Sequence, residues 1–203
     1  MELLPWIFSS GWASGINGYA VVVVLGVLGR LGADDVPDAL TRTDVLVAAL
    51  VMWCVDAVAD KVPYVDSTWD VVHTAVRPTI GAIVSALIAG DQDTLGQASA
   101  AAFGGGTALV SHLVKAGIRA GINTSPEPAS NIVVSTGEDL AVAGVVALSV
   151  ISPWLAAGIA AVFLTIGILL VVLLVGRIRA FRRKRRERRE RKAALNAAGS
   201  PPG

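Results

Sequence analysis

The segment "WLAAGIAAVFLTIGILLVVLLVG", residues 154–176, contains 23 consecutive residues without a charged side chain. As an α-helix it would be about 35 Å long, at about 1.5 Å per residue. The hydrocarbon core of a bilayer is about 30 Å thick, so this segment is long enough and apolar enough to cross it. It therefore predicts an integral membrane protein with at least one spanning helix.

The composition of the whole chain supports the same class. Of its 203 residues, 54% are hydrophobic and only 16% are charged, and the mean hydropathy is +0.64. Soluble domains are about 25% charged on average. We predict an all-α, polytopic helix bundle over residues 1–176, with the lipid bilayer of the cytoplasmic (plasma) membrane around it.

Five further apolar segments have the character of spanning helices, although charged residues shorten most of them. Residues 45–55, for example, are an apolar run of eleven residues between Asp44 and Asp56. A helix this short needs protein or water around its polar ends, so we expect it inside the bundle. Pro153 separates the last two segments, because proline cannot continue a helix. The six predicted spans are about 10–32, 44–60, 71–90, 95–122, 132–152 and 154–176.

Positive charge is concentrated directly after the last apolar segment. Residues 177–192 contain 11 of the 17 basic residues and two acidic ones, whereas residues 1–176 contain 6 basic and 14 acidic residues. This run predicts a cytoplasmic tail, residues 177–203, that binds anionic lipid headgroups. Nucleic acid is not an expected partner, because the run has one aromatic residue, Phe181, and base stacking needs more. Residues 193–203 are predicted to be disordered.

The tail also predicts an orientation for the bundle. Six crossings would return the N-terminus to the side of the tail, so both termini are expected in the cytoplasm. The polar loops at 33–44 and 90–94 would then face outward together. Arg30 and Arg42 would lie outside, and four other basic residues of the bundle would lie near its cytoplasmic ends.

Two internal repeats are compatible with the sequence, and only one of them can be the main repeat. Residues 15–32 match 104–121 in three positions, which pairs the first predicted helix with the fourth as an inverted repeat. Residues 63–81 match 126–144, which instead pairs the two polar loops in parallel. Gly11 and Gly15, and the run Gly104–Gly106, favour close approach of helices in lipid. The sequence is also compatible with a homo-oligomer, because such glycines can equally form contacts between two copies of the chain.

Ionisable and amide side chains gather in two parts of the chain that are otherwise apolar. Residues spaced by three and four positions share one face of a helix, which places Asp70, His73 and Arg77 on one stripe. Such a stripe is costly in lipid, so it is expected to face the bundle interior or a water-filled cavity and to bind a substrate. The candidate substrate-binding residues are Asp56, Asp60, Lys61, Asp66, Asp70, His73 and Arg77 in the first group, and His112, Lys115, Arg119, Asn123, Glu127, Asn131, Glu138 and Asp139 in the second.

Two polar segments adjoin these groups, "DKVPYVDSTWDVVHTAVRP" at 60–78 and "NTSPEPASN" at 123–131. Non-helical backbone at membrane depth is tolerated where it lines a cavity or is buried in protein. We therefore expect the two segments to enclose one vestibule. No catalytic residue, cofactor or metal ion is predicted, because the chain lacks Walker, GxSxG, HExxH and CxxC patterns and has one cysteine, Cys54.

Several longer motifs resemble one known family. They are "GINGYAVVVVLGVLGR" (15–30), "ADKVPYVDSTWDVVHTAVRPTIGA" (59–82), "HLVKAGIRAGINTSPEPASN" (112–131) and "STGEDLAVAG" (135–144). Through them the chain is similar to the bacterial integral-membrane domain-of-unknown-function family 4126, over roughly residues 10 to 170. The resemblance implies residence in a membrane and implies no activity.

Three functions are compatible with the sequence. The preferred hypothesis is a small transporter or channel whose charged site takes an ion, an anionic solute or a lipid headgroup. A structural or partner-binding membrane protein, in which the same charges only fix the helices in register, is the first alternative. A membrane-embedded lipid-modifying enzyme is the second, in which a histidine acts as a base or His73, His112, Asp70 and Glu138 hold a metal ion.

Overall fold

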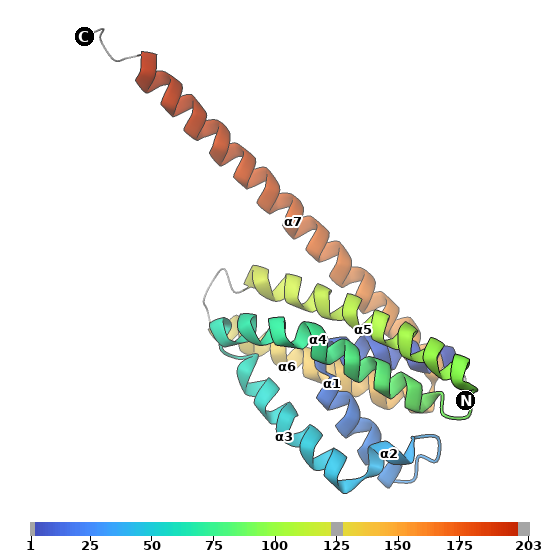
Figure 1. The fold of residues 1–203 in the computed structure, drawn as a ribbon. Helices are drawn as coiled ribbons and strands as arrows, with labels where there is room; N and C mark the ends of the chain where they lie inside the picture. Colours follow the sequence, from blue (N-terminus) through green and yellow to red (C-terminus); the bar gives the residue numbers. More distant parts are fainter. Residues whose placement is uncertain (1–2, 123–127, 199–203) are drawn as a thin grey trace.

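The computed structural model describes the backbone of residues 3–122 and 128–198, and their side chains except at 63, 64, 66, 67, 122, 128–131, 189 and 191–198. Within these ranges the chain is entirely helical and has no strand (Figure 1). The helices are α1 (Leu3–Arg30), α2 (Asp38–Thr41), α3 (Thr43–Ala59), α4 (Pro63–Ile88), α5 (Thr94–Ile122), α6 (Pro128–Ile151) and α7 (Pro153–Ala198).

Each of the six predicted apolar segments overlaps one of the six long helices and extends at most two residues past its end, and α2 is an additional short helix. By length and composition, four helices of the described chain can cross a membrane: Leu3–Arg30, Thr68–Ile88, Ile132–Ile151 and Pro153–Arg188. Helix α3 has only 17 residues, and α5 contains His112, Lys115 and Arg119. The prediction of an all-helical membrane protein is therefore confirmed, whereas the count of six spans is not.

Helix α1 is broken near its middle. Asn17 has extended backbone angles, φ −151° and ψ 92°, so two helical halves meet at this residue. The side-chain Oδ1 of Asn17 accepts a hydrogen bond of 3.0 Å from the backbone N–H of Ala20. This is the usual role of an asparagine at a helix N-cap, and it starts the second half of α1.

The two ends of α1 lie close to each other. Leu3, at its start, and Asp34, four residues after its end, line the same cavity of about 280 Å³, together with Asp91 from the α4–α5 loop. A straight helix of this length would separate its ends by about 42 Å. The structure thus replaces the predicted straight crossing by residues 10–32 with a helix that enters the bundle, breaks at Asn17 and turns back.

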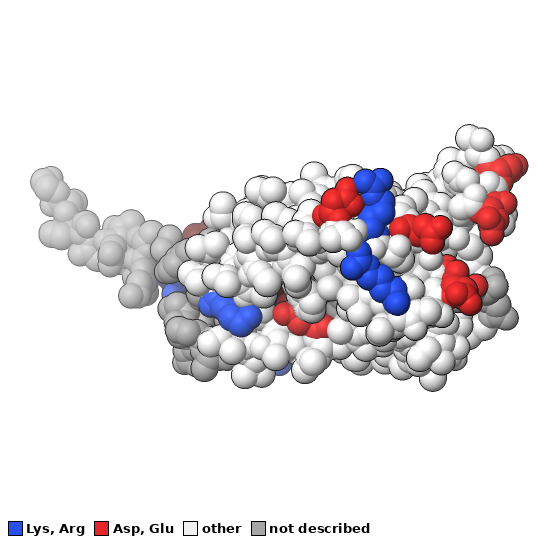
Figure 2. Space-filling model, turned by 90° about the horizontal axis from the view of Figure 1, so that it is seen from below, with Lys and Arg blue, Asp and Glu red and all other residues white. Residues whose placement is uncertain are grey.

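The α1–α2 loop and the α4–α5 loop lie at the same end of the bundle, as predicted, since Asp34, Asp35, Asp91 and Gln92 line one cavity. Acidic side chains gather at one end of the face in Figure 2. Acidic residues of the two loops thus lie together at this end of the bundle, whereas the basic residues are concentrated in the tail.

Glycines allow α1, α4 and α5 to pack with their backbones in contact. A Cβ atom on Gly11 would lie 2.8 Å from the carbonyl oxygen of Gly104, and one on Gly15 would overlap the carbonyl oxygen of Ala108. Gly81 on α4 also faces Gly104, at 3.2 Å from its carbonyl oxygen. The predicted close approach of small residues is therefore found within one chain.

Helix α7 packs on the bundle with its first half and leaves it with its second half (Figure 1). Apolar residues of the first half, such as Leu169, Leu170 and Leu173, are exposed, which is the pattern of a helix surrounded by lipid. The helix continues to Ala198. The predicted disorder of residues 193–203 stays a prediction, and 199–203 lie outside the described residues.

Candidate functional site

Polar side chains from α1, α3, α4, α5 and α6 meet in the interior of the bundle, and we call this group the polar centre. It brings together ten of the predicted site residues and Asn17, which the sequence analysis did not select. Most of them are buried, including the large side chains of Arg77 and Arg119, which are 0% and 1% exposed. The ten predicted members are Asp56, Asp60, Asp70, His73, Arg77, His112, Lys115, Arg119, Glu138 and Asp139.

The other five predicted site residues are not placed in the polar centre. Lys61 is half-buried near the end of α3, where its Nζ donates to the carbonyl oxygen of Ala57 at 2.8 Å. The remaining four, Asp66, Asn123, Glu127 and Asn131, have side chains outside the described residues. The predicted vestibule formed by the two polar segments stays a prediction for the same reason.

Arg77 occupies one half of the polar centre and lies within 4.0 Å of three carboxylates, of which Asp60 is the most distant at 4.0 Å. Its Nη2 lies 3.1 and 3.2 Å from the two carboxylate oxygens of Asp56. Its Nη1 lies 3.3 Å from Asp70, which is seven residues earlier on the same face of α4. Asp56 also accepts a hydrogen bond of 2.8 Å from the indole Nε1 of Trp69. A buried guanidinium thus has the carboxylate partners that its desolvation requires.

The two histidines lie on either side of Arg77 and make different contacts. The Nδ1 of His112 lies 3.3 Å from Nη1 of Arg77, a group that can only donate, so Nδ1 is the acceptor and the proton is on Nε2. In His73, Nδ1 lies 2.9 Å from the carbonyl oxygen of Trp69 and therefore carries the proton. Its Nε2 faces the hydroxyl of Tyr19 at 3.3 Å. His112 therefore has the contacts of a neutral histidine, whereas His73 Nε2 also lies 3.6 Å from the carboxylate of Asp56.

These contacts bear on the hypothesis of a metal site. A guanidinium next to His112 repels a metal cation, and the two imidazoles point to different partners. Within the described part of the chain, no three His, Cys, Asp or Glu residues are arranged to hold a metal ion. The residues proposed for a metal-dependent enzyme are therefore not gathered as a ligand set there.

Lys115 and Arg119 form the other half of the polar centre with Asp60 and Glu138. Lys115 Nζ lies 2.6 Å from Asp60 Oδ2 and 3.4 Å from Glu138 Oε2. Arg119 Nη2 lies 3.4 Å from each of the same two carboxylates. Asp60 is thus the closer partner of Lys115, and Glu138 Oε2 accepts no hydrogen bond from the described residues.

The break in α1 lies directly at Lys115. Because the helix ends at Asn17, carbonyl groups before it lose their helical partners. One of them, the carbonyl of Ile16, accepts a hydrogen bond from Lys115 Nζ at 3.2 Å. One turn earlier, the carbonyl of Trp12 accepts a hydrogen bond from Ser111 Oγ at 2.8 Å. A cation at the C-terminal end of a helix is favourable because of the helix dipole. Lys115 therefore stabilises the break as well as the two carboxylates.

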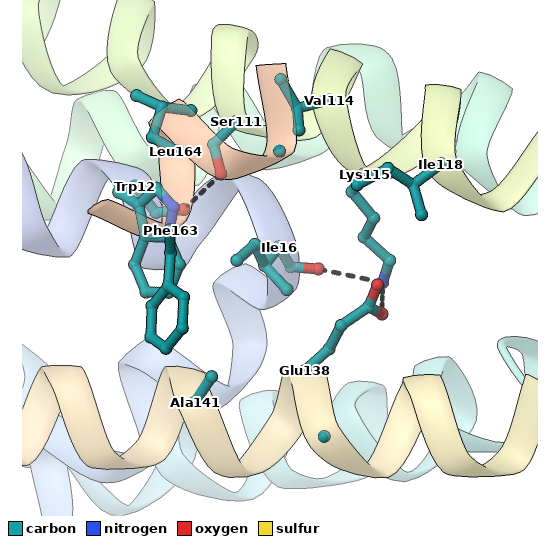
Figure 3. Close-up of a pocket in the computed structure, with 12 residues that line it drawn as sticks. Trp12, Ile16, Ser111, Val114, Lys115, Ile118, Glu138, Ala141, Phe163 and Leu164 are labelled. Carbon is teal, nitrogen blue, oxygen red and sulfur yellow. Dashed lines mark hydrogen bonds and ion pairs between the residues drawn. The ribbon is translucent and has the colours of Figure 1, made fainter. Parts of the chain in front are cut away.

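A cavity of about 220 Å³ adjoins Lys115 and Glu138, between α1, α5, α6 and α7 (Figure 3). Its walls are largely apolar and include Trp12 and Phe163, whose rings stack with centroids 5.7 Å apart. Lys115 and Glu138 meet at the other end of the view in Figure 3. A cavity with apolar walls and a charged end fits a small amphipathic solute.

The sequence model of one family, described as "Domain of unknown function (DUF4126)", matches residues 4–173. The chain belongs to this family. The DUF4126 region contains the whole polar centre and ends within α7, before the basic residues begin. No curated protein matches the chain. No solved structure matches it either.

Asn17 is the member of the polar centre in this DUF4126 chain that sequence reasoning missed. A signal was present, because it lies in "GINGY", where two glycines and an asparagine, all poor helix formers, follow each other closely inside an apolar segment. The Nδ2 of Asn17 donates to Asp139 at 3.0 Å, so the residue also connects α1 to α6.

Proposed function

We propose that this protein is a small membrane transporter that binds an anionic solute or an anionic lipid headgroup at Lys115 and Arg119. The observation that supports this most is the break of α1 at Asn17, beside buried cations and a cavity. Transporters commonly use discontinuous helices, whose ends within the membrane bind substrates and ions. Ionisable residues at membrane depth are expensive, which favours a functional role for them.

The distances indicate how an anion can enter the site. Glu138 is the weaker partner of Lys115, because its Oε2 lies 3.4 Å from Nζ and accepts no hydrogen bond there, whereas Asp60 lies at 2.6 Å. A carboxylate or phosphate group that displaces Glu138 would retain both ionic contacts and add charge-assisted hydrogen bonds. Its apolar part would occupy the cavity between Trp12 and Ile118. Movement of Glu138 would thus accompany binding.

The proposed transporter lies in the plasma membrane with its basic tail in the cytoplasm, next to anionic lipid headgroups. Since α1 turns back on itself, the N-terminus would lie at the opposite side, with the acidic loops. This differs from the sequence-based expectation of two cytoplasmic termini, which depended on α1 crossing the membrane.

A structural role is the second candidate, and the contacts of Arg77 favour it. Its carboxylate partners come from α3, from Asp60 at the end of α3 and from α4, and it also contacts His112 on α5. Such a network can fix three helices in register without binding anything. In this case the protein would show no flux of any solute.

Uptake into proteoliposomes tests the transport proposal. Radiolabelled benzoate and inorganic phosphate are the probes, because one has an apolar body and the other has only charge. We expect the wild type to take up at least one of them above the level of protein-free liposomes. Lys115→Met should abolish uptake, and Lys61→Met, a lysine outside the polar centre, should retain it.

The folding control is the thermal unfolding midpoint of each variant in detergent. If Lys115→Met does not fold, Glu138→Gln replaces it: loss of this anion should change the apparent KM for the transported probe. Absence of uptake of either anion by the folded wild type, or equal uptake by folded Lys115→Met, would contradict the proposal.

A further inference from the structure

A second cavity, of about 240 Å³, lies on the other side of the α1 break, between α3 and α6. It is lined by Leu50, Trp53, Cys54, Ala57 and Asp139. Leu50 and Cys54 are exposed on the outer surface of the bundle. The cavity therefore opens sideways, and Asp139 is its one charged lining residue among those described.

The contacts of Asp139 differ from those of the other carboxylates in the polar centre. Its Oδ1 accepts hydrogen bonds from two neutral groups, Asn17 Nδ2 at 3.0 Å and Trp53 Nε1 at 3.4 Å. Each of the other four carboxylates lies within 4.0 Å of a lysine or arginine nitrogen. No described lysine, arginine or histidine lies that close to Asp139. Its negative charge is thus not balanced by a nearby cation of the described chain.

The summed charge of the whole polar centre is also negative, which favours a bound cation. Its described side chains comprise five carboxylates and three cations, Arg77, Lys115 and Arg119. The carboxylates still outnumber the cations when His73, which lies 3.6 Å from Asp56, is counted as protonated. An uncompensated carboxylate at membrane depth is costly, so a bound cation would be stabilised there.

The lining of the cavity indicates what kind of cation fits. A metal ion such as Ca²⁺ needs six or more oxygen ligands, whereas this cavity offers one carboxylate among apolar walls. An ammonium group needs only hydrogen-bond acceptors and a negative charge, and an indole ring such as that of Trp53 attracts it further. Apolar side chains suit an apolar body attached to the ammonium.

We propose that Asp139 anchors a binding site for a small organic ammonium ion, with the apolar body of the ligand against Leu50, Trp53 and Cys54. The cavity is smaller than the roughly 300–1,000 Å³ of pockets for drug-sized ligands, so the ligand is small. The site does not depend on anion transport, because it lies on a different cavity from Lys115.

Calorimetry on the full chain in phosphatidylcholine nanodiscs tests this site, with empty nanodiscs as the blank. The probe is phenethylammonium, and 2-phenylethanol is the matched neutral ligand, with the same number of non-hydrogen atoms. We expect phenethylammonium to bind at least tenfold more tightly than the alcohol. Asp139→Asn should weaken its binding at least tenfold, and the matched control Asp44→Asn, on exposed α3 sequence outside the cavity, should bind like the wild type.

A second variant keeps the test valid if Asp139→Asn does not fold. Cys54→Phe fills the cavity from its exposed wall and leaves Asp139 in place, so it should also weaken binding at least tenfold. Equal binding of the alcohol, or phenethylammonium binding within twofold of wild type in either folded variant, would overturn the proposal. Lys61→Met, a lysine outside the polar centre, should leave this binding unchanged. The measurement is binding and not flux, so a failure of anion uptake does not decide this test.

Discussion

Asn17 links the backbone of α1 to the charges of the polar centre. Its Oδ1 caps the second half of the helix at Ala20, and its Nδ2 donates to Asp139. An asparagine can do both because its amide group has an acceptor and two donor hydrogens. The same side chain therefore positions the start of one half-helix and one carboxylate of α6.

Replacing Asn17 with alanine should destabilise the protein by about 1–3 kcal/mol, because a helix cap is lost and Asp139 loses a donor. Alanine also favours a continuous helix, which the packing of α1 does not permit. The measurement is the free energy of unfolding in detergent, from denaturant titrations followed by circular dichroism.

Ser14→Ala is the matched control for this change. Ser14 is also fully buried in α1, but its hydroxyl makes no hydrogen bond with the described residues. Its replacement should therefore change stability by less than about 0.5 kcal/mol. Equal stability of Asn17→Ala and the wild type would show that the cap and the Asp139 contact contribute nothing to the break.

Spacing along a helix predicted part of the polar centre. Asp70, His73 and Arg77 do share one face of α4, because the three- and four-residue period is a local property of the helix. Spacing cannot tell that Arg77 pairs with Asp56 on α3, since this contact depends on how two helices pack. Nor can it separate neighbours such as Glu138 and Asp139, which face different cavities.

At the scale of elements, glycine positions decide how closely the helices approach. In "GGGTALV", Gly104 and Gly105 contact α4, whereas a Cβ on Gly106 would meet nothing within 4 Å. The sequence alone does not distinguish these three glycines, because each of them is equally compatible with a helix interface or a lipid-facing surface. Their roles follow from the rotation of α5 about its axis.

Gly15→Ala should destabilise the protein by about 1–3 kcal/mol, as expected for an overpacked contact. The added methyl group would overlap the Ala108 carbonyl and lie 2.7 Å from Ser111 Cβ, so α1 and α5 must separate. Gly106→Ala is the control, and it should be neutral or stabilising by up to about 1 kcal/mol, because alanine is the better helix former. Thermal unfolding of both variants in detergent checks the difference. A Gly15→Ala protein as stable as Gly106→Ala would contradict the close contact between the two helices.

At the scale of the whole molecule, hydropathy predicted the class and most helices but not the path of α1. A hydropathy pattern reports which residues avoid water, and both halves of α1 do so. It contains no information on whether a helix continues straight, which here depends on a single residue and its tertiary contacts. The positions of both ends of α1 therefore required the structure.

Labelling of single introduced cysteines distinguishes an α1 that turns back from an α1 that crosses the membrane. In a Cys54→Ser background, Leu4→Cys and Asp34→Cys should react with a membrane-impermeant maleimide from the same side of intact cells, because both ends of α1 lie at one cavity. Ile178→Cys, at the start of the basic tail, should react only after permeabilisation. Gln92→Cys serves as the reference for the side of the α4–α5 loop. If Leu4→Cys and Asp34→Cys react from opposite sides, α1 crosses the bilayer, and a straight helix would have to replace the break at Asn17.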